Sequence, residues 1–296
     1  MKNALAPLLF LFLNFLQLSG PLAQAQFVAL GASTQLNGID PVYGMFGQVE
    51  TTYKGQLGDY AFWKPPKGSL QLLAYQSASL SGINAHCLAG TYADPQNFNI
   101  AGFQQCTDKN GNVQFFKFDS GATATLITAQ LHGSQAVAGY FDNFHFLYTG
   151  FISTPVFDSN GAVRYYNTVN YSVPGSLSTQ LLAASKTEIA GSFENSNNTW
   201  SGFIQQTATG AITVVNFPGA VNTGITAIGS KCYAGYYDMG DGAHHGFIHC
   251  RHGFVPFDIG YGGTWITQIL ENGDVVGYFE QRQNGYRGFI WKRLAR

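Results

Sequence analysis

Residues 223 to 258 read TGITAIGSKCYAGYYDMGDGAHHGFIHCRHGFVPFD, and this stretch carries the pattern that decides the fold. It contains four short apolar runs, ITAI, CYAGYY, HGFIHC and FVPFD, separated by segments that contain Gly. Apolar runs of this length between turn-forming residues are typical of consecutive antiparallel strands. The stretch therefore predicts a unit of four short strands, and nothing in it resembles a helix.

The same unit recurs along the whole chain. In its second run a Gly is followed two residues later by an aromatic residue, and its third run contains a Phe. The pairs are Gly44 with Phe46, Gly90 with Tyr92, Gly139 with Phe141, Gly191 with Phe193, Gly235 with Tyr237 and Gly277 with Phe279, and the third-run residues are Phe62, Phe103, Phe151, Phe203, Phe247 and Phe289. A period of roughly 40 to 50 residues with four strands is typical of a β-propeller blade. We therefore expect an all-β protein, a six-bladed β-propeller with four-stranded antiparallel blades.

The two ends of the chain carry complementary parts of one unit. The sixth unit has three runs and reaches Arg296 without a fourth, whereas residues 27 to 32 form a spare apolar run near the N-terminus. We expect this N-terminal strand to complete the last blade, because a ring closed in this way leaves no strand edge exposed.

The first 25 residues have the composition of a signal peptide. Lys2 precedes an apolar core over residues 8 to 18, and Ala23-Gln24-Ala25 has small residues where a signal peptidase cleaves. The alternative is a retained membrane anchor, but the apolar core has about half of the ~20 residues needed to span a bilayer. We expect residues 1–25 to be the signal peptide and residues 26–296 to be a single domain, secreted or periplasmic.

The composition limits the classes of partner. Charged residues make up 10% of the chain and the formal net charge is −1, so no basic stripe is available to neutralise phosphates. We expect no nucleic-acid partner and no transmembrane segment after signal cleavage. The partner that remains is a carbohydrate or a protein, and we expect the propeller itself to be a monomer.

The four cysteines occupy equivalent positions in two units. Cys87 and Cys232 lie three residues before the second-run Gly, and Cys106 and Cys250 lie three residues after the third-run Phe. If Gly and Phe are opposed on neighbouring antiparallel strands, the register also opposes Cys87 to Cys106 and Cys232 to Cys250, within reach of a disulfide. A secreted chain favours disulfides over the alternatives, which are free thiols or zinc ligands.

Two sets of side chains have the chemistry of cation sites. Carboxylates follow the second run in five units, at Asp94, Asp142, Glu194, Asp238 and Glu280. They could bind a cation such as calcium at the rim of the disc, but acidic residues also begin hairpin turns, and we favour that role. His245 and His249 share one face of a strand and form a second, weaker candidate, for a transition metal. No cofactor is otherwise expected.

The departures from repetition are the candidate binding elements. Residues 47 to 59 and 154 to 178 are longer than their counterparts and are predicted to be loops, where binding residues are often placed on a rigid scaffold. Tyr165, Tyr166 and Tyr171 lie in the second segment and are candidate ligand contacts, because exposed rings pack well on sugars and on proteins.

Several third runs resemble a known repeat. They read HGFI at residues 245–248, RGFIW at 287–291 and YAFW at 60–63, each preceded by a Gly followed by aromatic residues. In these features the chain resembles the bacterial extracellular repeat family named for its His-Ala-Phe (HAF) motif, with Gly instead of Ala in five of six units. The resemblance covers the predicted mature chain and implies a secreted propeller, without implying an activity.

Two functions follow from this reading. The favoured one is a secreted, non-catalytic propeller that binds a glycan, a cell-surface component or a protein through loops on one face. The alternative is a glycoside hydrolase or lyase with carboxylates at the central channel, whose catalytic residues the sequence does not identify. Because most acidic residues occupy repeated positions, no unique acid pair stands out, and an enzyme is the weaker expectation.

Overall fold

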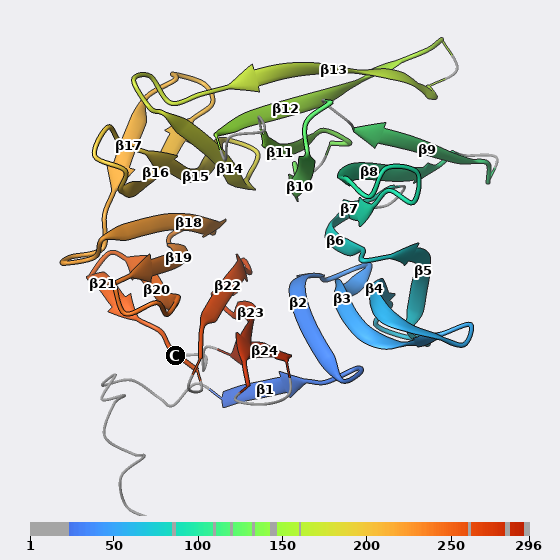
Figure 1. Ribbon diagram of the computed structural model, residues 1–296, viewed down its shortest axis with the longest axis horizontal. Helices are drawn as coiled ribbons and strands as arrows, with labels where there is room; N and C mark the ends of the chain where they lie inside the picture. The colour runs from blue at the N-terminus through green and yellow to red at the C-terminus, as the bar shows by residue number, and fades with distance from the viewer. Residues whose placement is uncertain are drawn as a thin grey trace, which may run out of the picture.

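The computed structural model describes residues 24–84, 87–108, 111–118, 121–131, 134–142, 147–159, 161–259, 262–281 and 285–292. All regular structure in these residues is β-strand, and the strands form six antiparallel groups of four around a common centre (Figure 1). Within each group the strands follow one another from the centre outward. The all-β class predicted from the sequence is confirmed.

The strands of the first three groups, from the inner strand to the outer, are as follows. The first group contains β2 (Ser33–Asp40), β3 (Gly44–Tyr53), β4 (Gln56–Lys64) and β5 (Gln71–Gln76), the second β6 (Ser79–Ile83), β7 (Cys87–Ala93), β8 (Ile100–Thr107) and β9 (Val113–Phe118), and the third β10 (Ala124–Gln130), β11 (Val137–Asp142), β12 (Tyr148–Phe157) and β13 (Val163–Tyr171).

The other three groups have the same order. The fourth contains β14 (Ser178–Ala184), β15 (Glu188–Glu194), β16 (Trp200–Gln206) and β17 (Ile212–Val215), the fifth β18 (Asn222–Ile228), β19 (Tyr233–Asp238), β20 (His245–Cys250) and β21 (Gly253–Pro256), and the sixth β22 (Thr264–Ile269), β23 (Val275–Glu280), β24 (Tyr286–Lys292) and, outermost, β1 (Gln24–Val28).

The N-terminal strand belongs to the last group. β1 pairs antiparallel with β24, with Phe27 opposite Phe289. The strand begins at Gln24, three residues before the run predicted from the sequence, so it includes two residues assigned above to the signal peptide. Residues 1–23, which hold the rest of that predicted peptide, lie outside the described part of the chain.

Hydrogen bonding divides the groups differently from the predicted six separate sheets. The described strands form five sheets, because the second and third groups join into one sheet of eight strands. The junction is a single parallel pair, Ala124 with Ile100, where the Ile100 amide donates to the Thr123 carbonyl at 3.4 Å. The start of the third group's inner strand therefore lies beside the second group's third strand.

The register corrects the alignment of the first unit. Phe62 lies opposite Gly47, not Gly44, and every other second-run Gly lies opposite the Phe of its third strand in the same way. Gly44 instead begins β3 with a φ of 98°. The sequence criterion failed here because Gly44 is followed two residues later by Phe46, whereas Gly47 is followed by Val49.

The second-run glycines are required by a backbone contact. A Cβ at Gly191 would lie 1.8 Å from the Gln180 carbonyl oxygen, and the corresponding distance is 2.1 Å or less at the other five positions. In each inner strand a bulge lies two residues after the residue that supplies this oxygen. The absence of a side chain at these positions therefore makes room for the carbonyl oxygen.

The bulged residues link neighbouring groups around the centre. They are Asn37, Ser81, Thr128, Leu182, Thr226 and Thr267, the residues at which each inner register shifts. Five of them donate a side-chain hydrogen bond to a carbonyl of the next inner strand: Asn37 to Leu80, Ser81 to Ile127, Thr128 to Leu181, Thr226 to Ile266 and Thr267 to Leu36. Leu182 cannot donate, so the junction of the fourth and fifth groups lacks this bond.

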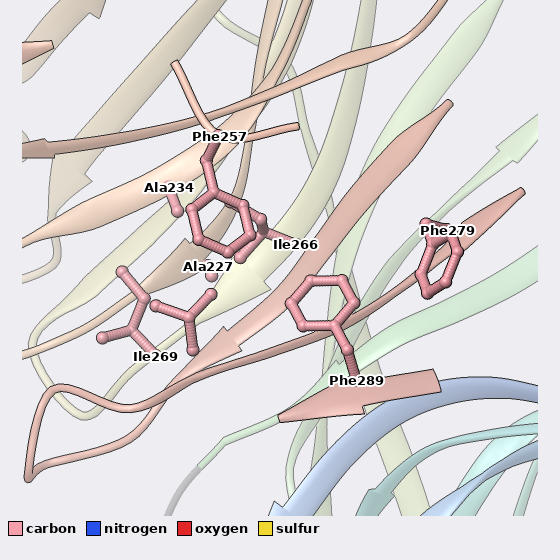
Figure 2. Packing of buried hydrophobic residues seen from close by; sticks show 8 residues of the cluster. Ala227, Ala234, Phe257, Ile266, Ile269, Phe279 and Phe289 are labelled. Carbon is pink, nitrogen blue, oxygen red and sulfur yellow. The ribbon is translucent and has the colours of Figure 1, made fainter. Parts of the chain in front are cut away.

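The core lies between the groups. Six clusters of buried side chains occupy the six junctions, and each contains one third-strand Phe that is at most 2% exposed. Figure 2 shows the cluster between the fifth and sixth groups, where Phe257 faces Phe289 and Ile266 packs beside them. The repeated aromatic residues are therefore packing residues.

Both predicted disulfides are present. Cys87 is bonded to Cys106 and Cys232 to Cys250, with Cα atoms 4.0 and 4.4 Å apart. Cys87 and Cys106 lie opposite each other on β7 and β8, and Cys232, directly before β19, is bonded to Cys250 at the end of β20, as predicted. In the described part of the chain no cysteine is free.

The two segments predicted to be loops are mostly strands. Residues 47 to 59 belong to β3 and β4, which continue to a two-residue turn at Lys54-Gly55 with φ of 49° and 83°. Residues 154 to 178 contain the ends of β12 and β14 and all of β13. The extra residues lengthen hairpins, since strand pairing continues as far as Tyr53 with Gln56 in the first group and Phe157 with Val163 in the third.

Candidate functional site

The inner strands of all six groups enclose a cavity of 1890 Å³ at the centre of the molecule. All six bulged residues line it, together with the loops that follow the inner strands. The hydroxyl and amide groups of five of these residues are engaged with the next strand, as described above. These hydrogen bonds hold the inner strands together, so any ligand contacts would come from other residues that line the cavity.

Uncharged amide side chains supply much of the remaining polar wall. Gln35, Gln48, Gln130, Gln135 and Gln268 all line the cavity. Both amide atoms of Gln130 are buried without a hydrogen-bond partner among the described residues, and so is the Oε1 atom of Gln135. Buried polar groups are nearly always paired in folded proteins, so these three atoms are exceptions.

Charged residues line the cavity at the end where the inner strands run into loops. They are Asp40, Lys186, Glu188 and Glu271. Asp40 caps its own turn, since its Oδ1 atom accepts from the backbone amides of Val42 and Tyr43 at 2.7 and 2.8 Å. Glu188 accepts a hydrogen bond from Gln206. In the described ranges no three His, Cys, Asp or Glu side chains are grouped so that they could hold a metal ion.

An aromatic pair lies at the other end of the cavity. Trp265 and Tyr278 both line it, and their rings stack with centroids 5.3 Å apart and an angle of 16° between planes. Tyr140 and Tyr236 occupy the same position as Tyr278, directly after the second-strand Gly. The Tyr236 ring lies over Gly224, where a Cβ would approach it to 2.5 Å.

These three hydroxyl groups are close enough to influence one another. Burial raises the pKa of Tyr140, Tyr236 and Tyr278, and the neighbouring Tyr236 hydroxyl raises the pKa of Tyr140 further, as Tyr140 does for Tyr278. The hydroxyls therefore remain protonated across the physiological range and can donate hydrogen bonds.

The predicted rim carboxylates lie at the opposite end of the inner strands from the charged loops. Asp142 is opposite Ala124, Glu194 opposite Ser178 and Asp238 opposite Asn222, each at the start of an inner strand. Asp94 follows β7 directly and Glu280 ends β23. The corrected register adds Glu50, opposite Ser33, which the sequence had not included.

These carboxylates differ in their partners. Asp94 is buried and accepts from the Lys117 ammonium at 2.5 Å, which holds its pKa below the usual range. The side chain of Asp238 accepts from Asn222 and from the Gly240 amide at 3.1 and 2.6 Å. Neither arrangement forms a metal cage.

The two candidate histidines have separate environments. The imidazole of His245 lies between two carboxylates, with Nδ1 2.9 Å from Asp258 Oδ2 and Nε2 3.0 Å from Asp241 Oδ2. His249 stacks on Tyr233 at 4.5 Å and meets Phe254 edge-on at 4.4 Å. The structure therefore does not bring His245 and His249 together as ligands of one ion.

The histidines should give folding stability a pH dependence of opposite sign. Burial lowers the pKa of His245, but its two carboxylate partners together outweigh burial and raise it overall, whereas burial lowers the pKa of His249. Stabilisation by His245 is complete below the unfolded pKa of about 6.5 and is lost as the pH rises through the folded pKa. At the acid end it fades as the pH falls through the lowered pKa of Asp241.

We therefore expect His245→Gln to lower the urea midpoint more at about pH 5.5 than at about pH 8.5. The difference should be on the order of a few tenths of a kcal/mol, since the pair is partly exposed. His249→Gln is the control, and its effect should change with pH in the opposite direction. Equal effects of His245→Gln at the two pH values would contradict the prediction.

The three candidate tyrosines have different surroundings. Tyr165 is 52% exposed and remains available to a partner. Tyr166 meets the rings of Phe116 and Phe118 edge-on at 5.1 and 5.0 Å, and its hydroxyl is hydrogen-bonded to Gln104. Tyr171 stacks on Phe203 of the fourth group at 5.9 Å. Tyr166 and Tyr171 thus join the long hairpin to the groups on either side.

Comparison with known proteins adds information on the fold. No family model and no curated protein matches the chain. A crystal structure of AofleA from Arthrobotrys oligospora matches with a TM-score of 0.53 and 13% identity, covering 94% of this chain and 90% of that one. This similarity shows a shared all-β architecture over almost the full length of both chains.

Two further structures match less closely. A puromycin hydrolase mutant complexed with PGG has a TM-score of 0.40 at 14% identity, and Pyrococcus horikoshii acylaminoacyl peptidase has 0.44 at 10%. The chain covers 42% and 43% of their lengths. At these scores the two matches carry no argument about this protein.

Sequence reasoning missed the residues that build the cavity. Two positions recur in every unit: the bulged position and the position after the second-strand Gly. In the fifth unit, residues 223–258, they are occupied by Thr226 and Tyr236. A comparison of the six units position by position, once Gly47 is aligned, would have found both.

Proposed function

We propose that the protein is a secreted, six-bladed β-propeller that binds a neutral, hydroxyl-rich ligand, such as a segment of a glycan, in its central cavity. The six four-stranded groups are the blades. Closure of the ring is supported by the β1–β24 pairing, and by the bond from Thr267 to Leu36 at 3.0 Å between the last group and the first.

The lining of the cavity is the observation that carries this proposal. Uncharged amide side chains, among them Gln130 and Gln135, line the same cavity as the stacked pair Trp265 and Tyr278. Pockets for small ligands combine apolar and aromatic surface with a few placed polar groups, and sugars present both hydroxyls and apolar ring faces. The cavity volume is large enough for several sugar units.

Secretion is supported by the disulfides. Two bonds between strands fit an oxidising compartment, where such bonds persist. No helix in the described residues is long and apolar enough to cross a membrane. The N-terminal residues with the composition of a signal peptide agree with export.

A second candidate function rests on the charged end of the cavity. Glu271 lines it beside Asn272, and Asp40 and Glu188 line other parts of the same end. A glycoside hydrolase or lyase would need two of these carboxylates on either side of the bound sugar. We favour binding because the carboxylates of Asp40 and Glu188 already accept hydrogen bonds, from the Val42 amide and from the Gln206 side chain.

The test is a glycan array with the folded protein, followed by calorimetry on any glycan retained. We expect Gln130→Ala to weaken binding about tenfold through the lost hydrogen bonds, and Leu182→Trp, which fills the cavity, to abolish it. Gln71→Ala on an outer strand is the matched control. Absence of binding across the array, or binding unchanged by Leu182→Trp, would contradict the proposal. Turnover abolished by changing Asp40, Glu188 or Glu271 to its amide would favour the enzyme.

A further inference from the structure

The end of the molecule away from the charged loops carries a group of aromatic side chains. Tyr140 and Tyr148, on neighbouring strands of the third group, meet edge-to-face with centroids 5.4 Å apart. Trp200 begins the third strand of the fourth group, and its ring centroid lies 6.1 Å from that of Tyr148. We call these three residues the aromatic cluster. They come from two groups: Tyr140 lies two residues before the end of β11, whereas Tyr148 begins β12 and Trp200 begins β16.

Two carboxylates accompany the aromatic cluster. Asp142 lies directly opposite Tyr148 on the paired strands β11 and β12, and Glu194 lies directly opposite Trp200 on β15 and β16. The Oδ1 atom of Asp142 is buried and has no hydrogen-bond partner among the described residues. Buried carboxylate oxygens ordinarily receive donors or a counter-ion, so this unpaired oxygen is an exception.

In the second group the equivalent carboxylate, Asp94, has a counter-ion. Asp94 has the Lys117 ammonium at 2.5 Å as its counter-ion. The structure gives neither Asp142 nor Glu194 an ion pair with a described lysine or arginine. Asp142 and Glu194 end their second strands, as Asp94 follows its own. The lack of a described lysine or arginine partner therefore distinguishes the carboxylates beside the aromatic cluster from Asp94.

We propose that the aromatic cluster, with Asp142 and Glu194, binds an organic ammonium group. Aromatic faces attract weakly hydrated cations, and quaternary or methylated ammonium groups are bound in this way by aromatic side chains. A nearby carboxylate adds a full charge to the attraction of the rings. The ligand is therefore the ammonium head group of a small molecule.

A metal ion is a poorer fit to the same residues. Calcium requires six to eight oxygen ligands around one point. The described residues contain no group of three or more His, Cys, Asp and Glu side chains that could hold a metal ion. Two carboxylates beside three rings can instead surround a larger cation of low charge density, which needs no cage of oxygens.

The proposed ammonium site is independent of the proposed glycan site. None of the five residues, Tyr140, Tyr148, Trp200, Asp142 and Glu194, lines the central cavity. One site can therefore fail its test without affecting the other.

The test uses choline and its uncharged analogue 3,3-dimethyl-1-butanol, which has nearly the same shape. Binding is followed by calorimetry and by saturation-transfer NMR on the methyl groups. We expect choline to bind at least about tenfold more tightly than the neutral analogue, because the charge supplies the attraction. Equal affinity for the two compounds, or no binding of choline at about 10 mM, would overturn the proposal.

Variants locate the site. Asp142→Asn and Trp200→Leu should each weaken choline binding about tenfold, since they remove the charge and one ring. Asp94→Asn is the matched control at the equivalent position and should leave binding unchanged. Because Trp200→Leu could disturb packing, circular dichroism and the melting temperature are measured for every variant, and Asp142→Asn, which keeps the side-chain shape, decides the outcome. Equal effects of Asp94→Asn and Asp142→Asn would contradict the proposed location.

Discussion

A chain that begins at Leu30 should lose its cooperative unfolding transition or melt at least about 10 °C below a chain that begins at Gln24. The shorter chain lacks β1, which pairs with β24 over five residues. It also loses the contact between the rings of Phe27 and Phe279, whose centroids are 5.7 Å apart, and the cation–π contact of Arg287 with the Phe27 ring. Each lost ladder hydrogen bond costs about 1 kcal/mol.

Exposure of β24 should add to the effect. An outer edge of unpaired backbone groups can pair with other chains, so we expect concentration-dependent aggregation of the shorter chain. The chain that begins at Gln24 is the control, because it keeps β1 and lacks the same upstream residues. Calorimetry and light scattering measure the two effects. Equal melting temperatures for the two chains would show that β1 is dispensable.

Gly191→Ala should destabilise the protein by about 3 kcal/mol or more, because overpacking against backbone cannot be relieved by a rotamer change. The added methyl would lie 1.8 Å from the Gln180 carbonyl oxygen. Relief requires β14 and β15 to separate, which would also disturb the bulge at Leu182.

Gly58→Ala is the matched control for this prediction. Gly58 also lies within a strand, but its added Cβ would make ordinary contacts, with the nearest atom, in the Tyr60 ring, at 3.7 Å. We expect a change within about 0.5 kcal/mol in either direction, as for most surface substitutions. Urea denaturation measures both variants. A small effect at Gly191 would mean that the inner strands can shift without loss of stability.

The repeated features of the chain could be predicted because they recur at fixed spacing. The opposed pair Gly235 and Phe247 followed from periodicity, and with it the bond between Cys232 and Cys250. The assignment failed at Gly44, where a local Gly-x-Phe pattern imitates the repeat next to the true position at Gly47. Strand pairing decides between two such neighbours, and it depends on residues far away in the chain.

The candidate sites were less predictable than the fold. The cavity depends on bulges, such as that at Thr226, and a bulge is a feature of strand pairing that becomes visible only when the six units are compared. The aromatic cluster joins Tyr148 to Trp200, which are separated in the chain by the three strands β13, β14 and β15. Periodicity places such residues at the same end of their groups but does not give their distance.

The long hairpin of β12 and β13 bears on the order in which the protein folds during synthesis. Its Tyr166 contacts Phe116 and Phe118 of the second group, while its Tyr171 stacks on Phe203 of the fourth (Figure 1 places β13 along the outer side of this region). A nascent chain exposes residues from the N-terminus onward, and its early parts fold first. Tyr166 can therefore pack against Phe116 and Phe118 as soon as the hairpin is synthesised, because both partners precede it in the chain. The ring of Tyr171 stays uncovered until Phe203 has left the ribosome.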